Sequence, residues 1–349
     1  MKTSNALLLK TLRGEPTDRM GIWLMRQAGR YLPEYRTLRQ QAGSFNTLCQ
    51  TPELACEVTL QPIRRFALDA AIIFSDILTI VDAYGHPVTF VEQKGPVISN
   101  PISCVADIEK LVEPDVDQAL DYVFAAIRLV RQALPRHLPL IGFAGSPWTL
   151  ATYMLEGSGS KTFTAIKGFR YKQPQAIHQL LTKLTTTITA TLQCQIASGA
   201  DIVMLFDTWG GILTPNDYDT FSLAYLSTII QNITASHPHI PIILFTKGGG
   251  LWLSDIAQSG ATAIGLDWTC DIAYARHQVG PNITLQGNLD PCALLASPEI
   301  VVNQTKKLLQ QPGLGQRFIC NLGHGILPNT PIESVQALIE TVQQHIPPP

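Results

Sequence analysis

Eight apolar runs of strand length recur along this chain, and they constrain its fold more than any other feature. Each run is continuously apolar rather than alternating and ends at a polar or glycine-rich stretch, which is typical of strands buried on both faces of a parallel sheet. The runs are GIWLM (21–25), AAIIFS (70–75), LPLIGFAG (138–145), DIVMLF (201–206), IPIILF (240–245), ATAIGLD (261–267), NITLQGN (282–288) and RFICNLG (317–323).

Stretches with helical periodicity separate most of these runs. The clearest are residues 116–134, 176–199, 254–260 and 331–346. Buried strands that alternate with helices predict a parallel sheet covered by helices, and eight such units suit closure into a single (β/α)8 TIM barrel of the α/β class. An open doubly wound sheet is the alternative. However, no GxGxxG follows the first run, and TKGGG (246–250) lacks the residue order of a phosphate loop.

Length and composition agree with one large barrel. The chain has 349 residues, 46% of them hydrophobic and 15% charged, and no Ser/Gly linker or low-complexity tract divides it. We therefore expect a single domain over residues 1–349, with an N-terminal extension over residues 1–20. Residues 79–102 alternate as a β-hairpin does, so we expect a hairpin that decorates the barrel.

Charge and cysteine content narrow the classes of partner and compartment. A formal net charge of −2 argues against a nucleic-acid binder, although residues 1–40 carry eight basic side chains against three acidic ones. No apolar run reaches the roughly 18 residues of a membrane helix, and the N-terminus has no signal-peptide core, so we expect a cytoplasmic protein without membrane partners. The seven cysteines form no CxxC pair, which indicates neither a disulfide framework nor a zinc ribbon.

Polar and charged residues follow each run, at the carboxyl ends of the strands where a barrel gathers its chemistry. They are residues 26–30, Asp76, residues 146–148, 207–211, 247–250, 267–268, 288–290 and 323–325. Together they offer donors for carboxylates, small residues that admit a bulky ligand, and carboxylates in apolar surroundings. We expect this end of the barrel to bind a ligand that carries several carboxylates.

The segment MRQAGRYLPEYR (25–36) concentrates arginines directly after the first run. A helix would stack Arg26 over Arg30 and place Gly29 in its interior, and both are unfavourable, so we predict a loop. Guanidinium groups pair well with carboxylates, which makes these two arginines candidate ligands for an acidic substrate. Solvated arginines at a surface turn are the alternative.

Other candidates rest on weaker local grounds. Asp76 can cap the following helix or hold a ligand that develops positive charge. His324, between two glycines, suits either a ligand contact or a histidine tied to the backbone. From the local sequence alone, we expect Tyr153 to be a core side chain and Thr208 to be a cap or turn residue. Cys320 and His324 are spaced like metal ligands, but a buried thiol near an unrelated histidine is the simpler interpretation.

Taken together, these motifs resemble those of the uroporphyrinogen decarboxylase family over nearly the whole chain. The segments that carry the resemblance are MRQAGRYLPEYR, FALDAAIIFSDIL, LIGFAGSPWTLATYMLEG, GLDWT, LQGNLDP and NLGHGI. The resemblance implies a (β/α)8 barrel, a homodimer, no metal and no organic cofactor. It also implies that the four acetate side chains of uroporphyrinogen III lose carbon dioxide to give coproporphyrinogen III, a step of haem and chlorophyll biosynthesis.

The resemblance assigns functional residues by position. The positions that match the family's substrate-binding residues are Arg26, Gln27, Ala28, Gly29, Arg30, Asp76, Phe143, Tyr153, Thr208 and His324. Among them it implies that Asp76 is essential, and we expect Arg26 or His324 to polarise the departing carboxylate or to deliver a proton. Arg36 keeps only a surface or dimer-contact role.

Two rival functions remain open from the sequence. A methyltransferase of the same barrel superfamily would need a set of His and Cys zinc ligands at the strand ends, and no such set is visible in the sequence. A non-catalytic tetrapyrrole-binding protein on a decayed barrel is the second rival, which the intact Asp76 and arginine segment oppose.

Overall fold

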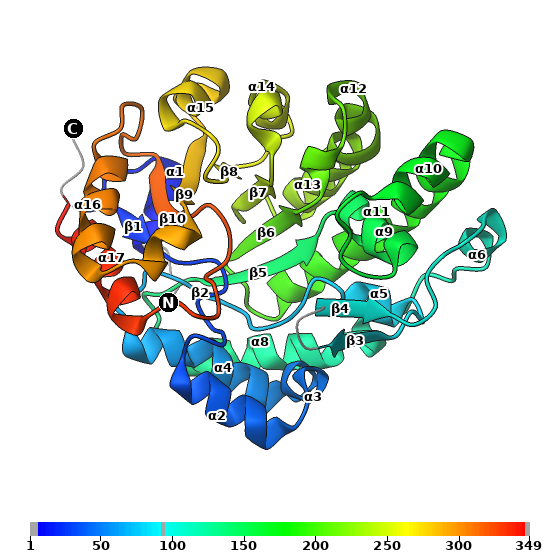
Figure 1. Ribbon diagram of the computed structural model, residues 1–349, viewed down its shortest axis with the longest axis horizontal. Coiled ribbons are helices and arrows are strands. Elements are labelled where there is room, and N and C mark those ends of the chain that lie inside the picture. The colour runs from blue at the N-terminus through cyan, green and yellow to red at the C-terminus, as the bar shows by residue number, and fades with distance from the viewer. Residues whose placement is uncertain (1–5, 92–94, 346–349) are drawn as a thin grey trace.

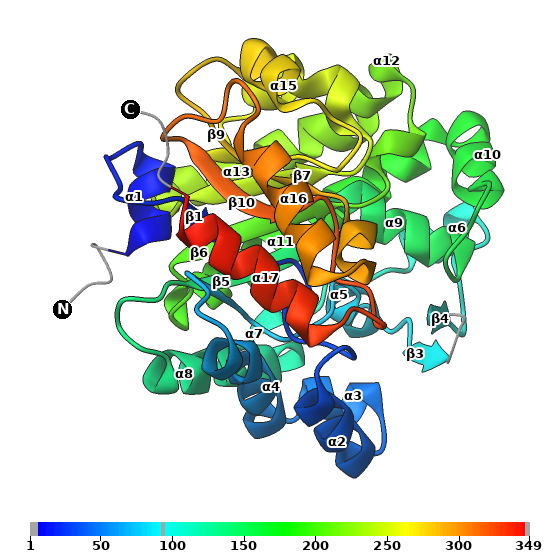
Figure 2. The same ribbon diagram turned by 60° about the vertical axis from the view of Figure 1, so that its left-hand side comes forward.

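The computed structural model describes residues 6–91 and 95–345. These residues form a curled sheet of eight parallel strands with helices around its outside (Figures 1 and 2). The strands are β1 (Gly21–Ile22), β2 (Ala71–Ile72), β5 (Leu140–Gly145), β6 (Ile202–Asp207), β7 (Ile242–Thr246), β8 (Ala263–Gly265), β9 (Thr284–Leu289) and β10 (Phe318–Leu322). Each predicted run overlaps one of them, and β6, β7 and β9 extend one residue beyond their runs, so the predicted (β/α)8 fold is confirmed.

Helices follow the strands and cover the outer face of the sheet. Among them are α4 (Pro52–Arg65), α8 (Asp121–Ala133), α9 (Pro147–Glu156), α11 (Pro174–Ala197), α13 (Ala224–Ser236), α15 (Ile272–Val279), α16 (Pro298–Leu309) and α17 (Ile332–Gln343). The others are α1 (Leu7–Arg13), α2 (Pro33–Ala42), α3 (Phe45–Gln50), α5 (Thr79–Ala83), α6 (Val105–Glu109), α7 (Val116–Ala119), α10 (Thr164–Lys172), α12 (Pro215–Tyr218), α14 (Leu253–Ala257), η1 (Gly210–Ile212), η2 (Asp219–Leu223), η3 (Gly249–Trp252) and η4 (Pro291–Leu295). The four predicted helical stretches correspond to α7 with α8, α11, α14 and α17, and residue 346 lies outside the described residues.

Local sequence signals set where α9 begins and ends, and this helix carries Tyr153 to the mouth of the barrel. The hydroxyl of Ser146 accepts a hydrogen bond from the Thr149 N–H at 3.0 Å, and Pro147 occupies the first helical position. The helix ends at Gly157, whose φ of 71° places it in the left-handed region that favours glycine.

The two edges of the sheet, β1 and β2, meet around Asp69 rather than through a strand ladder. The Asp69 N–H donates to the Ile22 carbonyl at 2.9 Å, and its carboxylate accepts the Ile22 N–H at 2.9 Å. Arg19 donates to both carboxylate oxygens at 2.8 and 2.6 Å, and Gln27 Nε2 donates to the Ala70 carbonyl at 3.1 Å. These bonds close the barrel.

Helix α1 covers the amino-terminal end of the barrel. Its Leu8, Leu9 and Leu12 are buried in one cluster with side chains of the barrel interior, such as Trp23 and Ile141. Thr284, the first residue of β9, donates to the α1 carbonyl of Thr11 at 3.2 Å. The described part of the predicted N-terminal extension therefore closes one end of the barrel, and residues 1–5 lie outside the described residues.

The decorating hairpin lies at the other end of the molecule from α1 (Figure 2). It consists of β3 (Val88–Val91) and β4 (Gly95–Ile98), which pair antiparallel, while residues 92–94 lie outside the described residues. The hairpin is shorter than predicted, because residues 79–83 form α5.

Among the described residues, no helix has the length and apolar character that crossing a bilayer requires.

Candidate active site

The first part of the arginine segment, residues 25–32, forms a loop between β1 and α2, as predicted for Arg26 and Arg30, and residues 33–36 begin α2. Arg26 adopts a φ of 60°, which is uncommon for a residue with a side chain and often marks a functional position. The side chains of Arg26 and Arg30 are exposed and make no hydrogen bond or ion pair to the described residues. By contrast, Arg19 and Arg65 pair with carboxylates elsewhere. The loop therefore holds two guanidinium groups free for a ligand.

Interactions beneath the loop fix its path. Gln27 is fully buried, and its side chain accepts the Leu24 N–H at 3.1 Å while donating to Ala70 across the barrel seam. Its side chain therefore anchors the loop, and its N–H and carbonyl are also paired, with the Leu24 carbonyl at 3.0 Å and the Tyr31 hydroxyl at 2.7 Å. Arg36 donates to the carbonyls of Arg30 and Tyr31 at 2.9 and 3.1 Å. This positioning role was not predicted, since it depends on how the loop folds back onto α2.

The turn after β10 lies directly against the loop. A Cβ atom added at Gly325 would collide with the side-chain stem of Arg26, so a glycine is needed where the two segments cross. Gly323 is packed equally closely against the backbone of Trp268, after β8. The glycines on both sides of His324 thus bring that histidine next to Arg26.

Asp76 follows β2 and is half-buried at the mouth. Its Oδ1 accepts the Leu78 N–H at 2.8 Å in the turn before α5, but the N-cap of α5 is Leu78 and has no side-chain cap, so Asp76 is not the helix cap that was the alternative from the sequence. No cation forms an ion pair with it among the described residues. Burial raises the pKa of this carboxyl, while the Leu78 N–H and the charge of Arg26 oppose the rise.

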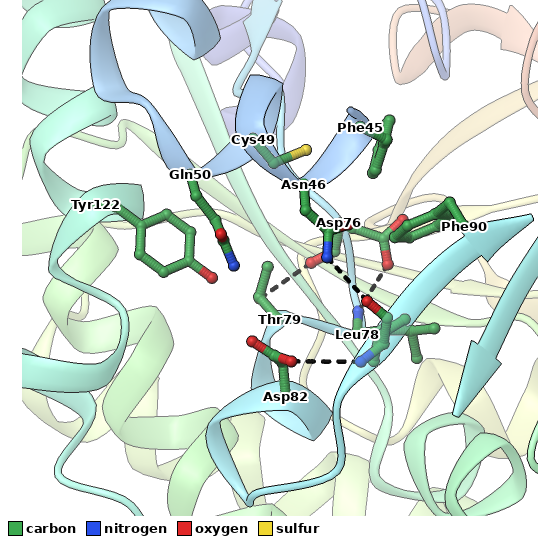
Figure 3. A pocket seen from close by; sticks show the side chains of 11 residues that line it. Phe45, Asn46, Cys49, Gln50, Asp76, Leu78, Thr79, Asp82, Phe90 and Tyr122 are labelled. Atoms are coloured by element: carbon green, nitrogen blue, oxygen red, sulfur yellow. Dashed lines mark hydrogen bonds between the residues drawn. The ribbon is translucent and has the colours of Figure 1, made fainter. Parts of the chain in front are cut away.

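A hollow of about 310 Å³ opens beside Asp76 (Figure 3). Figure 3 shows side chains from α3, α5 and the hairpin converging on it, with Tyr122 from α8 on the far side. The lining residues are Phe45, Asn46, Cys49, Gln50, Asp76, Leu78, Thr79, Asp82, Val88, Phe90 and Tyr122. The insertion after β2 therefore builds one wall around the aspartate.

Aromatic side chains continue the mouth away from Asp76. Phe143, Phe206 and Phe245, from three neighbouring strands, contact one another edge to face, with ring centroids 5.5 and 6.1 Å apart. Phe245 in turn contacts the ring of His324 at 6.1 Å. Phe143 and Phe206 are partly exposed and provide apolar surface, whereas the buried Phe245 connects this row to the histidine.

Tyr153 and Thr208 lie on the same side of the mouth. The ring of Tyr153 packs against Trp209 at 5.9 Å, and Trp209 directly follows Thr208. Burial raises the pKa of Tyr153, and the charge of Asp76 raises it further. Both residues are only partly buried, so their hydroxyls are within reach of a ligand.

His324 is neutral in the free protein at neutral pH. Burial lowers its pKa to about 4, and the charges of Arg26 and Lys247 act in the same direction. The electrostatic coupling among Arg26, Asp76, Tyr153 and His324 means that the structure brings these predicted residues together. The charges of Arg26 and Asp76 balance within this group, and the exposed Arg30 on the same loop adds a further positive charge for a carboxylate-bearing ligand.

A fully buried carboxylate beneath Thr208 was not predicted as a site residue. Asp207 accepts hydrogen bonds from the hydroxyls of Ser146 at 2.6 Å and Ser222 at 2.8 Å, and burial raises its pKa. A Cβ at Gly210 would collide with this carboxylate. Asp207 therefore fixes the end of β6, from which Thr208 and Trp209 extend.

The described residues contain no group of three or more His, Cys, Asp or Glu side chains able to hold a metal ion. Cys320 is fully buried within β10. The ligand set that the rival methyltransferase needs is therefore not assembled in the described part of the chain.

Comparisons with known proteins agree with this geometry. Residues 3–345 match the family model described as Uroporphyrinogen decarboxylase (URO-D). The uroporphyrinogen decarboxylase of Coxiella burnetii (strain Dugway 5J108-111) is 54% identical over 345 residues, which cover 98% of this chain and 96% of that protein. That of Legionella pneumophila (strain Paris) is 52% identical over 344 residues, covering 99% and 98%.

A methyltransferase from Methanosarcina mazei has a similar fold, with a TM-score of 0.80 over 98% of both chains. Its sequence identity of 20% supports a shared fold and nothing further. The match to one family model over almost the entire chain and the high identity of its relatives are decisive: this chain belongs to the uroporphyrinogen decarboxylase family.

Proposed function

We propose that this protein converts uroporphyrinogen III to coproporphyrinogen III by removing the carboxyl groups of its four acetate side chains. One observation carries the proposal: two arginines and a half-buried aspartate, none of which forms an ion pair with another described residue, share one apolar barrel mouth. This combination suits a ring that bears carboxylates at its rim and N–H groups at its centre. Family membership supports the same reaction.

The substrate's chemistry accounts for each part of the mouth. Its eight carboxylates need guanidinium partners, which Arg26 and Arg30 supply, and its flat pyrrole faces suit the aromatic row that begins at Phe143. Its four pyrrole N–H groups can converge on one acceptor. Asp76 fits this role, because only its Oδ1 accepts a protein hydrogen bond among the described residues.

The remaining contacts follow from position. Ala28 and Gly29 are small enough for the ring to approach the loop backbone, which the buried Gln27 holds in place. The hydroxyls of Tyr153 and Thr208 lie near Trp209 and are placed to bind carboxylate arms.

Each cycle consumes one proton and releases one carbon dioxide. Protonation of a pyrrole carbon beside the acetate makes the ring cationic, and the electrons of the breaking C–C bond then flow into the ring as carbon dioxide leaves. The exocyclic methylene that results takes up a proton and becomes a methyl group, while the first proton returns to solvent. Asp76 stabilises the cationic ring through its negative charge.

The electrostatic contribution of Asp76 is large but incomplete. Two charges about 4 Å apart at an effective dielectric near 20 interact by about 4 kcal/mol, or roughly a thousandfold in rate. Positioning of the ring and of a proton donor must supply the rest. His324 is neutral before substrate binds, and an incoming carboxylate beside it would raise its pKa and so favour proton uptake.

The proposal also covers the domain organisation, the oligomeric state and the cellular location of the protein. We propose one domain over residues 1–349, because all eight described barrel strands enter one sheet. We also propose a homodimer, which is supported by exposed Leu251, Tyr274 and Leu295 on segments that follow three consecutive strands. Seven unpaired cysteines support a cytoplasmic location, where thiols stay reduced.

The test is direct. Purified protein is incubated with uroporphyrinogen III under anaerobic conditions, and the products are separated by carboxyl number. The proposal expects intermediates with seven, six and five carboxylates before coproporphyrinogen III, together with release of carbon dioxide. Unaltered substrate in the presence of protein that binds it would support the rival non-catalytic function.

A further inference from the structure

The segment after β7 places a charged side chain at the mouth that the proposed reaction has not used. Lys247 directly follows Thr246, the last residue of β7. Its N–H donates to the Asp207 carbonyl at 3.2 Å, and its carbonyl accepts the Gly211 N–H at 3.0 Å. On the other side, the Gly248 N–H donates to the carboxylate of Asp267. Neighbouring segments therefore fix the backbone of Lys247 from both sides.

Close backbone packing makes this position rigid. A Cβ at Gly211 would collide with the Lys247 carbonyl oxygen, so the segments after β6 and β7 approach more closely than other residues allow. Mobility at this point is thus confined to the Lys247 side chain itself. The ammonium group can therefore change position only by rotation about the bonds of the Lys247 side chain.

Two indole rings flank that ammonium group. Lys247 Nζ lies 5.8 Å from the ring centroid of Trp209 and 5.8 Å from that of Trp268. Both distances are near the outer limit of about 6 Å for a cation–π contact, so the two rings attract the ammonium group weakly and do not replace a counter-ion. Lys247 forms no ion pair among the described residues.

The carboxylate on the neighbouring segment, Asp267, already has hydrogen-bond partners. One oxygen of Asp267 accepts from the Gly248 N–H, and the other accepts from the N–H and hydroxyl of Thr269 at 2.8 and 2.5 Å. Asp267 therefore anchors the segment rather than pairing with the lysine. A half-buried ammonium between aromatic rings, without a counter-ion from the described chain, is suited to an anion from outside.

Lys247 acts on the same part of the mouth as Arg26. These two charges, from the segments after β7 and β1, are the ones that help to lower the pKa of His324. Tyr153 contacts Trp209, one of the two rings beside Lys247, and the charge of Asp76 raises the pKa of the same tyrosine. The mouth thus has a cationic group on the β7 side in addition to the arginine loop.

We propose that the ammonium group of Lys247, held between Trp209 and Trp268, is a further substrate-binding residue that pairs with a carboxylate arm of the tetrapyrrole. This inference rests on the proposed function. An ammonium accepts a carboxylate from many directions, whereas a guanidinium fork favours one plane. That tolerance suits a substrate that must be held in four successive orientations as its acetates react.

The test compares two substitutions at this position. Lys247→Met keeps the apolar stem and removes the charge, and Lys247→Arg keeps the charge. We expect Lys247→Met to raise the KM for uroporphyrinogen III about tenfold, equivalent to about 1.4 kcal/mol, with kcat changed less than about twofold. Lys247→Arg should recover part of this loss. The matched control is Lys306→Met on the outer helix α16, which should leave both constants unchanged.

The identity of the arm follows from inhibition by coproporphyrinogen III, which retains propionates but no acetates. If Lys247→Met weakens this inhibition by the same factor, the partner is a propionate, and unchanged inhibition identifies an acetate. A KM for Lys247→Met equal to that of the parent protein overturns the inference. So does a loss that Lys247→Arg does not relieve and that is matched by lowered thermal stability, because it indicates a structural role.

Fluorescence of the flanking tryptophans keeps this test separate from the proposed function. Titration with uroporphyrinogen III, read before turnover, gives a Kd for each variant. A parent protein that binds the compound but releases no carbon dioxide contradicts the proposed function alone. The role of Lys247 is then decided by whether Lys247→Met raises the Kd.

Discussion

Asp76 is a carboxylate that the fold partly buries without an ion-pair partner among the described residues. Burial raises its pKa, which means that the folded protein disfavours the charged form. As the pH rises through the ordinary pKa of an aspartate, the unfolded chain releases this proton more readily than the folded protein, so the group lowers the stability of the fold. Such a residue is explained more readily by its function than by packing.

Replacing Asp76 with Asn should reduce activity and raise stability together. The amide keeps an oxygen for the Leu78 N–H but removes the negative charge, so we expect kcat to fall about a thousandfold or more. The free energy of unfolding at neutral pH should rise, because a buried charge is gone. Steady-state kinetics and urea unfolding measure the two effects.

Asp82→Asn is the matched control, since Asp82 lines the same hollow and accepts the Val88 N–H at 3.3 Å. It should retain near-normal kcat. Near-normal turnover by Asp76→Asn would instead remove Asp76 from the proposed mechanism.

His324 makes stability depend on pH in a defined direction. In the unfolded chain a histidine binds a proton below about pH 6.5, whereas the folded pKa is about 4. As the pH falls through this window, the unfolded state gains a proton that the folded state does not, so the folded protein loses stability. The loss should reach roughly 2–3 kcal/mol near pH 4.

The difference between the parent protein and His324→Gln isolates this effect from other titrating groups. Urea unfolding of both at several pH values should show the parent losing stability relative to the variant as the pH falls from about 7 to 4. A difference that stays constant over this range contradicts a neutral, buried His324.

Much of the site could be predicted at the residue scale, because the carboxyl ends of barrel strands meet at one mouth. Arg26, Asp76 and His324 follow three different strands, and the structure couples their charges as that rule requires. The anchoring roles of Gln27 and Arg36 could not be predicted. They depend on the path of one loop, which the local sequence does not determine.

At the scale of elements, the contact between the β1 loop and the β10 turn shapes the site. Gly325→Ala should displace Arg26, because the added methyl group would occupy the space of its side-chain stem. We expect kcat/KM to fall about 10–100-fold, since small displacements of a positioning group have effects of this size. The displaced side chain is flexible and exposed, so thermal stability should change little.

Gly168→Ala in α10 is the control, because no atom lies within 4 Å of the added methyl group. It should leave kinetics unchanged and stabilise the helix slightly. Unchanged kinetics for Gly325→Ala would mean that Arg26 does not need its observed position.

The success of the strand predictions has a physical reason. Strands buried on both faces must be continuously apolar, so the eight runs were recognisable without knowledge of their partners. The insertion after β2 is different, since α5 and the hairpin strands are short and partly exposed. Tertiary contacts with α3 and α9 decide its conformation, and these contacts are not encoded in local periodicity.

At the scale of the whole molecule, the seam between β1 and β2 holds the barrel closed. Asp69 joins the two edges through Ile22 and binds Arg19 with two short hydrogen bonds. The sequence predicted closure but not this means of closure, because both edge strands are only two residues long in the structure. A carboxylate replaces the missing strand ladder.

Asp69→Ala should therefore destabilise the entire barrel. The substitution leaves the Arg19 guanidinium without its carboxylate partner and the buried Ile22 N–H without its acceptor. We therefore expect a loss of about 2–4 kcal/mol in the free energy of unfolding. Asp69→Asn keeps an acceptor for Ile22 and should lose less. Asp121→Ala breaks a solvent-exposed pair with Arg128 and should change stability by about 1 kcal/mol or less. If Asp69→Ala proved as mild as Asp121→Ala in urea unfolding, the seam would have to be held by the packing of α4 and α17 instead, because these helices contact β2 and β1.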